Sequence, residues 1–174
     1  MIHPLFVHFP IAMLVVYSLF ELFRFEAAAK QPYWFYIKAS LVISGTFLAY
    51  LTLATGDQAE RFINETGTEF QKSLVNTHAI FAGSATAIFS LIAFSYSIEW
   101  LLKEPKASEF LNKRFLNIFL ISSKIISKPY ILITLALVGT TAITVAGALG
   151  AAMVYGPHID IFVSFIYSFV SSFL

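Results

Sequence analysis

Four histidines are the residues of this chain best suited to binding chemistry: His3, His8, His78 and His158. The chain contains no cysteine, which excludes disulfides, thiolate metal sites and covalent haem attachment through a Cys-x-x-Cys-His motif. A metal would therefore have to be held by histidine, methionine, tyrosine or carboxylates. Neutral imidazole nitrogens ligate iron without burying a charge, and this is how a non-covalent haem is held between helices.

The composition indicates which elements carry these histidines. Residues are 58% apolar and only 12% charged, so the chain cannot hide its apolar surface in water and belongs in lipid. Every backbone polar group in a bilayer must be satisfied internally, and the long apolar runs select helices over a barrel. A net charge of +1 without a basic patch excludes a nucleic-acid partner. We find no nucleophile and base pair or phosphate loop that would indicate a hydrolase.

Four segments are long enough to cross a hydrocarbon core about 30 Å thick. We place these spans near residues 4–25, 34–55, 74–102 and 130–155. Two further segments are amphipathic: a basic and phenylalanine-rich helix at about 108–128, expected on the cytoplasmic surface, and a short tail helix at about 160–174. The predicted fold is all-α, an integral membrane four-helix bundle forming one membrane domain over residues 1–174.

The orientation follows from the basic residues, which favour the cytoplasmic side. Only Arg61 and Lys72 of the eleven basic residues fall on one side of the predicted spans. The other nine are Arg24, Lys30, Lys38, Lys103, Lys106, Lys113, Arg114, Lys124 and Lys128. We therefore expect both termini and the second connection to face outward.

All four histidines then lie near the outer face. His8 sits roughly 6 Å inside a helix that begins at Pro4, and His78 enters the third span to a similar depth. Pro10 frees the carbonyl of Phe6 and can kink the first helix toward the bundle axis. We predict that His8 and His78 ligate one haem b iron, with His3 and His158 serving a second cofactor or orienting the first pair.

Carboxylates near the same face could orient a ligating histidine or could themselves bind a metal other than haem iron. Asp57 or Glu60 could accept the second ring N–H of a ligating imidazole, and a mixed set would equally suit zinc, copper or non-haem iron. In the plainer reading, Asp57, Glu60, Glu65 and Glu69 form a solvated acidic loop and the histidines are interfacial. Similarly, Glu21, Lys38 and Glu99 are read as side chains that extend from the segment ends to the membrane interface.

Two stripes of small residues predict close helix contacts, because helices in lipid associate by close packing. The stripe of the third span comprises Ala79, Gly83 and Ala87. That of the fourth comprises Ala142, Ala146 and Gly150. We expect the two stripes to face each other or the first pair of helices.

The opening HPLFVHFPIAMLVVYSLFEL resembles the start of a bacterial membrane-protein family called domain of unknown function 2231. The resemblance extends over nearly the whole chain and rests on these positions: His3, Pro4, His8, Pro10, Gly56, Asp57, Glu60 and His78. The end of the fourth span, GALGAAMVYGPHID, matches the family only loosely. The resemblance therefore does not assign a role to His158. The segment before Pro129 and the phenylalanine-rich tail depart from the usual short form and indicate contacts to another subunit.

The resemblance implies a multi-pass protein of the bacterial inner membrane with periplasmic termini. Members of the family often accompany cytochrome or other redox modules. We therefore expect a haem b-binding subunit that transfers electrons near the periplasmic face within a larger complex, with a cytochrome or quinone partner. The alternatives are a cofactor-free structural subunit and a divalent-metal binding or transport protein, which would need polar residues deep in the membrane.

Overall fold

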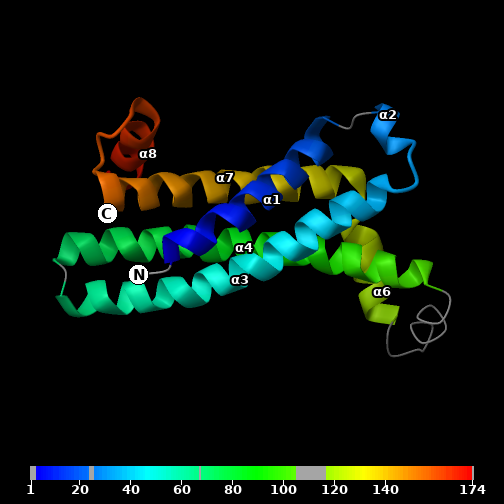
Figure 1. Cartoon of the computed structure of the whole chain (residues 1–174), viewed down its shortest axis with the longest axis horizontal. Coiled ribbons are helices and arrows are strands. Elements are labelled where there is room, and N and C mark those ends of the chain that lie inside the picture. The colour runs from blue at the N-terminus through cyan, green and yellow to red at the C-terminus, as the bar shows by residue number, and fades with distance from the viewer. Residues whose placement is uncertain (1–2, 24–25, 67, 105–116, 174) are drawn as a thin grey trace.

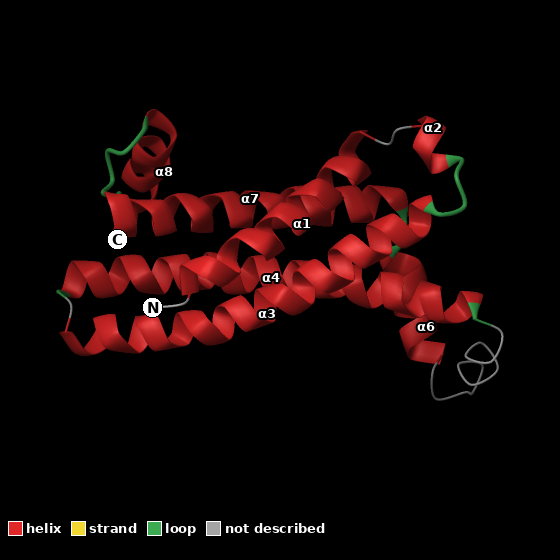
Figure 2. Ribbon diagram, viewed as in Figure 1, coloured by secondary structure: helices red, strands yellow, loops and turns green. Residues whose placement is uncertain are grey.

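The part of the chain that the structure describes is helical and has no strands (Figure 2). The structure is a computed structural model that describes residues 3–23, 26–66, 68–104 and 117–173, without the side chains of residues 3–5, 26, 58–60, 62–64, 66, 69 and 70. The helices long and apolar enough to span a membrane are α1 (His3–Phe23), α3 (Trp34–Thr66), α4 (Glu69–Lys103) and α7 (Pro129–Tyr155). The shorter helices are α2 (Glu26–Ala29), α6 (Asn117–Ile126) and α8 (Ile161–Ser171). The predicted all-α four-helix membrane fold is confirmed.

The four long helices run along the length of the molecule (Figure 1), and their contacts close a ring in the order α1, α3, α4, α7. Helices α1 and α4 each pack against both α3 and α7, so they stand at opposite corners. Glycines allow two of the contacts to be close: a Cβ on Gly45 would lie 2.9 Å from Leu14 Cδ2, and one on Gly139 would lie 2.7 Å from Phe89 Cε2. Both distances are shorter than side chains tolerate, so the glycines set the spacing of α1 to α3 and of α7 to α4.

Helix ends follow from local sequence. Thr68 caps α4 with a capping box in which its hydroxyl accepts from the backbone N–H of Gln71. Helix α7 begins at Pro129, whose missing N–H costs nothing at that position, and ends at Gly156, whose φ of 96° suits glycine. Asp160 starts α8 by accepting from the backbone N–H of Val163 at 2.7 Å.

Helix α3 continues well beyond the predicted end near Thr55. Asp57, Glu60 and Glu65 lie within it and Glu69 begins α4, so the predicted acidic loop was wrong. The apolar run ends near Asp57, but helix α3 continues beside α4 to Thr66 (Figure 1). The end of an apolar run marked the end of the span and not the end of the helix.

The small-residue stripe of α7 faces the bundle, but that of α4 does not. Ala142 and Ala146 are buried, whereas Ala87 is exposed and a Cβ on Gly83 would meet nothing within 4 Å. The prediction for α4 was wrong because both faces of a helix in lipid are apolar, so small residues alone do not identify the inner face. The inner face of α4 instead carries Ala85, Phe89, Ile92, Ala93 and Tyr96.

The described part of the segment between α4 and α7 packs against α4. Residues 105–116 of the predicted surface helix lie outside the described residues, and α6 begins at Asn117. The hydroxyl of Ser95 donates to the carbonyl of Ser123 at 3.2 Å and lies 2.6 Å from the hydroxyl of Ser127. The opposite side of α6 exposes apolar side chains: Ile118, Ile121 and Ile125. Helix α6 is therefore amphipathic, as predicted, and it turns Ser123 to α4 while Lys124 stays exposed.

The tail forms the predicted short amphipathic helix. Val163 and Val170 of α8 are buried against α7, in clusters with Ala152 and Leu149. The opposite side of the tail exposes four aromatic rings: Phe162, Phe165, Phe169 and Phe173. Helix α8 thus packs on the end of α7 (Figure 1), and its opposite side leaves a second apolar surface exposed.

The bundle has two ends of different chemistry. The start of α1, the connection between α3 and α4, and the end of α7 with α8 lie at one end, here called the histidine end (Figure 1). The end of α1, helix α2, the end of α4 and α6 lie at the other, here called the basic end. The alternation of the four spans therefore places the histidine-bearing segments together.

Candidate functional site

His78 is held against a neighbouring helix of the bundle. It lies on α4, is half-buried, and its Nδ1 lies 2.8 Å from the carbonyl oxygen of Ala146 on α7. A carbonyl oxygen can only accept, so Nδ1 carries the proton and donates it. In the neutral ring the lone pair is then on Nε2, the nitrogen with which such a tautomer ligates a metal.

The small residues of α7 make this hydrogen bond possible. Gly150 lies one turn after Ala146, and a Cβ placed on it would lie 3.3 Å from His78 Cε1. Because neither residue carries a bulky side chain, the imidazole reaches the main chain of α7 directly. The acceptor of the His78 ring N–H is therefore the carbonyl of Ala146, and not the carboxylate of Asp57 or Glu60 that the sequence suggested.

His8 lies on a different surface of the bundle. Helix α1 turns Pro10, Leu14 and Tyr17 inward, and His8 falls about 160° around the helix from Pro10, where its side chain is exposed. The carbonyl of Phe6, which Pro10 leaves without its helical donor, accepts instead from the hydroxyl of Thr52 on α3 at 3.1 Å. This bond attaches the first turns of α1 to the histidine end of α3.

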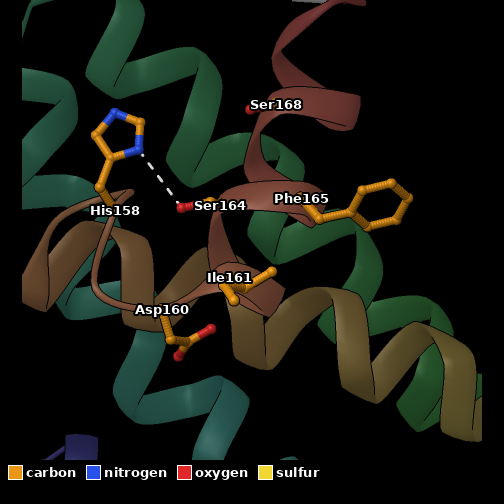
Figure 3. A pocket seen from close by; sticks show the side chains of 6 residues that line it. All are labelled: His158, Asp160, Ile161, Ser164, Phe165 and Ser168. Atoms are coloured by element: carbon orange, nitrogen blue, oxygen red, sulfur yellow. Dashed lines mark hydrogen bonds between the residues drawn. The ribbon is translucent and has the colours of Figure 1, made fainter.

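His158 lies in the turn between α7 and α8 and is exposed (Figure 3). The hydroxyl of Ser164 donates to the carbonyl of Pro157 at 3.0 Å, so its oxygen is left to accept from His158 Nδ1 across a long 3.4 Å. An open hollow of about 530 Å³ lies beside this pair and is lined also by Asp160 and Phe165. The turn is ordered by backbone bonds and does not need a ligand to hold it.

The structure thus places all four histidine positions at one end, but spreads them over α1, α4 and the turn after α7. His3 begins α1, His8 and His78 lie on opposite corners of the ring, and His158 follows α7. Asp57 is exposed on α3. Among the described side chains, no three of His, Asp and Glu gather closely enough to hold a metal ion.

A charged cluster at the basic end was missed by the sequence analysis. Glu21 is only 3% exposed, and its Oε1 accepts from Lys38 Nζ at 2.8 Å, Tyr96 Oη at 2.6 Å and Tyr17 Oη at 3.2 Å. The prediction that Glu21 and Lys38 extend to the membrane interface was therefore wrong: they form an ion pair in which Glu21 is buried and Lys38 is half-buried. The 17-residue separation of this pair gave no signal, because only the turn from α1 into α3 brings the two side chains together.

Four apolar helices in a ring, with their polar clusters at the two ends, define an integral membrane bundle. The chain belongs to the family described as "Predicted membrane protein (DUF2231)", whose family model matches residues 1–161. The membership suggested by the opening motif is confirmed. No curated protein and no solved structure matches the chain.

Proposed function

We propose that the chain is a haem b-binding subunit of a membrane redox complex, in which His78 and His8 at the histidine end would ligate the haem. The hydrogen bond from His78 Nδ1 to the carbonyl of Ala146 carries this proposal. Ligating histidines usually donate their second ring N–H to a carbonyl or carboxylate, which orients the ring and raises the basicity of the ligating nitrogen. His78 has such a partner and holds its lone pair on Nε2.

The donor set suits a haem better than a bare metal ion. A structural or catalytic zinc needs three or four side chains, and no such group gathers among the described residues. A haem needs only one or two protein ligands, because the porphyrin supplies the equatorial nitrogens. When bound, the haem would supply the electron-carrying chemistry, while this chain supplies ligation, orientation and an apolar surround.

His8 is the candidate for the second ligand because it also lies on a spanning helix at this end. Its side chain is exposed on a different surface from that of His78, so the two would ligate one haem only after α1 rotates about its axis. His3 and His158 would serve a second cofactor or orient the first. The excess of basic residues at the opposite end favours a bacterial inner-membrane location with periplasmic termini. Electron transfer would then occur near the periplasmic face, with a cytochrome as partner.

The proposal is tested by the visible spectrum of the detergent-purified protein, oxidised and after reduction with dithionite. We expect a Soret band and a sharp α-band on reduction. His8→Ala and His78→Ala should each remove them, whereas His158→Ala, at an exposed turn, should keep them. A parent protein without haem absorption, or two variants that keep the parent spectrum, would overturn the assignment.

A matched pair of glycine variants tests the positioning of His78 by α7. Gly150→Val places a side chain against the imidazole, whereas a Cβ on Gly147 meets nothing within 4 Å. We expect Gly150→Val to shift or weaken the haem spectrum and Gly147→Val to leave it unchanged. Equal spectra for the two variants would mean that His78 is not the ligand.

A second candidate function is that of a cofactor-free structural subunit. The exposed aromatic side of α8 favours it, because one side of this helix already covers α7 while the other is left for a neighbour. The same absorption measurement separates the two functions, since a structural subunit would purify without haem.

A further inference from the structure

A pocket of about 260 Å³ opens at the basic end, between the end of α1 and the start of α3. Its polar lining comes from Glu21, Gln31 and Lys38. Its walls are aromatic and include Phe20 and Trp34, whose ring centroids are 4.7 Å apart. The pocket lies at the opposite end of the bundle from the histidines, so it is independent of the proposed haem.

The pocket offers an acceptor that the bundle does not use. All three hydrogen bonds to Glu21 end on Oε1, and no donor among the described residues reaches Oε2. A carboxylate this deeply buried is costly unless its oxygens are hydrogen-bonded. Because Glu21 lines the pocket, a ligand that carries an O–H group can supply the missing donor.

The pocket also offers donors, and its charge is balanced. Lys38 carries three N–H groups, of which one is directed to Glu21, and the amide of Gln31 can donate and accept. The ammonium and the carboxylate cancel, so a neutral ligand fits better than an anion or a cation. Flat aromatic walls favour a planar ring through stacked or edge contacts.

The position in the membrane indicates how such a ligand would arrive. The pocket lies where the apolar spans Phe6–Phe23 and Trp34–Asp57 meet at their common end. A ligand with a polar ring and an apolar tail could place the ring in the pocket and leave the tail in lipid.

From these features we propose that the pocket binds the headgroup of a lipid-soluble quinol. The carboxylate oxygen of Glu21 that lacks a donor accepts from a ring hydroxyl, and Lys38 or Gln31 donates to the ring's other oxygen. The corresponding quinone, which has no hydroxyl for Glu21, binds more weakly. Neither statement depends on whether the histidine end holds a haem.

The two tryptophans of the chain allow a direct binding test. Trp34 lines the pocket, whereas Trp100 packs on Tyr36 with ring centroids 5.2 Å apart. Trp100→Phe leaves Trp34 as the reporter, and Trp34→Phe leaves Trp100. With a decyl-substituted benzoquinol titrated into the detergent-purified protein, we expect saturable quenching of Trp34 and only a linear, partition-driven change of Trp100. Decanol should give no saturable change.

In the Trp100→Phe background, Glu21→Gln should raise the half-saturating quinol concentration by about tenfold or more, the effect of losing one hydrogen bond to a charged acceptor. Because this change also removes the partner of Lys38, Ala29→Leu provides a second variant. Ala29 lines the pocket without contributing to the ion pair, and its enlargement should abolish saturation by filling the space.

Equal quenching of both tryptophans, or saturable quenching that survives Ala29→Leu unchanged, would overturn the proposal. Displacement of the quinol by a short-chain phosphatidylethanolamine at equal concentration would overturn it too, by assigning the pocket to a phospholipid headgroup. Haem content has no part in this measurement, so failure of the quinol site and failure of the haem proposal are separate results.

Discussion

Glu21 joins three helices through one oxygen atom. Its carboxylate lies on α1, its cationic partner Lys38 comes from α3, and the shortest of its hydrogen bonds comes from Tyr96 on α4. Tyr17, one turn earlier on α1, donates a third hydrogen bond to the same oxygen. A buried charge of this kind is costly when unpaired, so its partners must remain in place for the helices to stay packed.

Breaking the pair from one side should therefore destabilise the bundle strongly. We expect Glu21→Gln or Lys38→Met each to lower the free energy of unfolding by about 3 kcal/mol, because each leaves a buried charge unpaired. The double variant should lose much less than the sum. Thermal or denaturant unfolding in detergent measures all three, with the exposed Glu104→Gln as a control within about 0.5 kcal/mol of the parent. Additive losses would show that the two charges act independently.

The residues of interest were predictable to different degrees. The scarcity of histidine and the depth of His78 in its span identified this residue from the sequence. Its partner Ala146 could not be inferred, because every residue has a backbone carbonyl and residue type does not indicate which one accepts a hydrogen bond. Glu21 was misread for a related reason. Its partner Tyr96 is 75 residues away, and a carboxylate near the end of an apolar run looks the same whether it faces water or the bundle.

At the scale of elements, Pro10 shows how a helix defect is used for packing. The proline removes the donor that Phe6 would have had within α1, and the hydroxyl of Thr52 replaces it from α3. The same hydroxyl lies 3.0 Å from the carbonyl of Leu48 in its own helix, so the bond is shared. The missing N–H of Pro10 in α1 is thus replaced by a hydrogen bond that joins α1 to α3.

This substitution of donors can be measured with a double-mutant cycle. Thr52→Val should lower the free energy of unfolding by about 1 kcal/mol, since it leaves the carbonyl of Phe6 without a donor in an apolar setting. In a Pro10→Ala background the helix supplies its own N–H, and the same change should cost much less. Unfolding in detergent gives both values. An equal cost in the two backgrounds would mean that Thr52 contributes through its packing and not through its hydroxyl.

The four membrane spans were predictable because the bilayer sets their length and apolarity, and the predicted bounds differ from those of the apolar spans by only a few residues. Features that the bilayer does not constrain could not be predicted. The extension of α3 beyond Asp57 depends on packing against α4, and the outward turn of Gly83 and Ala87 depends on which side of α4 its neighbours occupy.

At the scale of the whole molecule, the bundle separates two kinds of chemistry by the thickness of the membrane. Imidazoles lie at the histidine end, and a buried ion pair with an aromatic pocket lies at the basic end. The proposed haem and the proposed quinol site would therefore face opposite compartments. This arrangement requires both termini to share one side of the membrane, as the even number of spans demands.

Reporter fusions test that arrangement directly. A periplasmic reporter attached after residue 174 should be active, and one inserted between Lys103 and Lys128 should be inactive, because nine of the eleven basic residues lie on that side and basic residues favour the cytoplasm. If the first reporter were inactive and the second active, the orientation would be the reverse of the predicted one. It would also move the histidine end to the cytoplasm.

The long α3–α4 pair has a practical consequence for imaging. Helix α3 runs nine residues past the apolar stretch that ends at Asp57, a rise of about 14 Å, without a break before Thr66. Figure 1 shows both helices continuing past the start of α1. A chain of 174 residues that is mostly embedded in a micelle gives electron cryo-microscopy little to align. A rigid helical fiducial spliced between Thr66 and the capping box at Thr68 would be continuous with α3 and would return to the capped start of α4, so its orientation would report the orientation of the bundle.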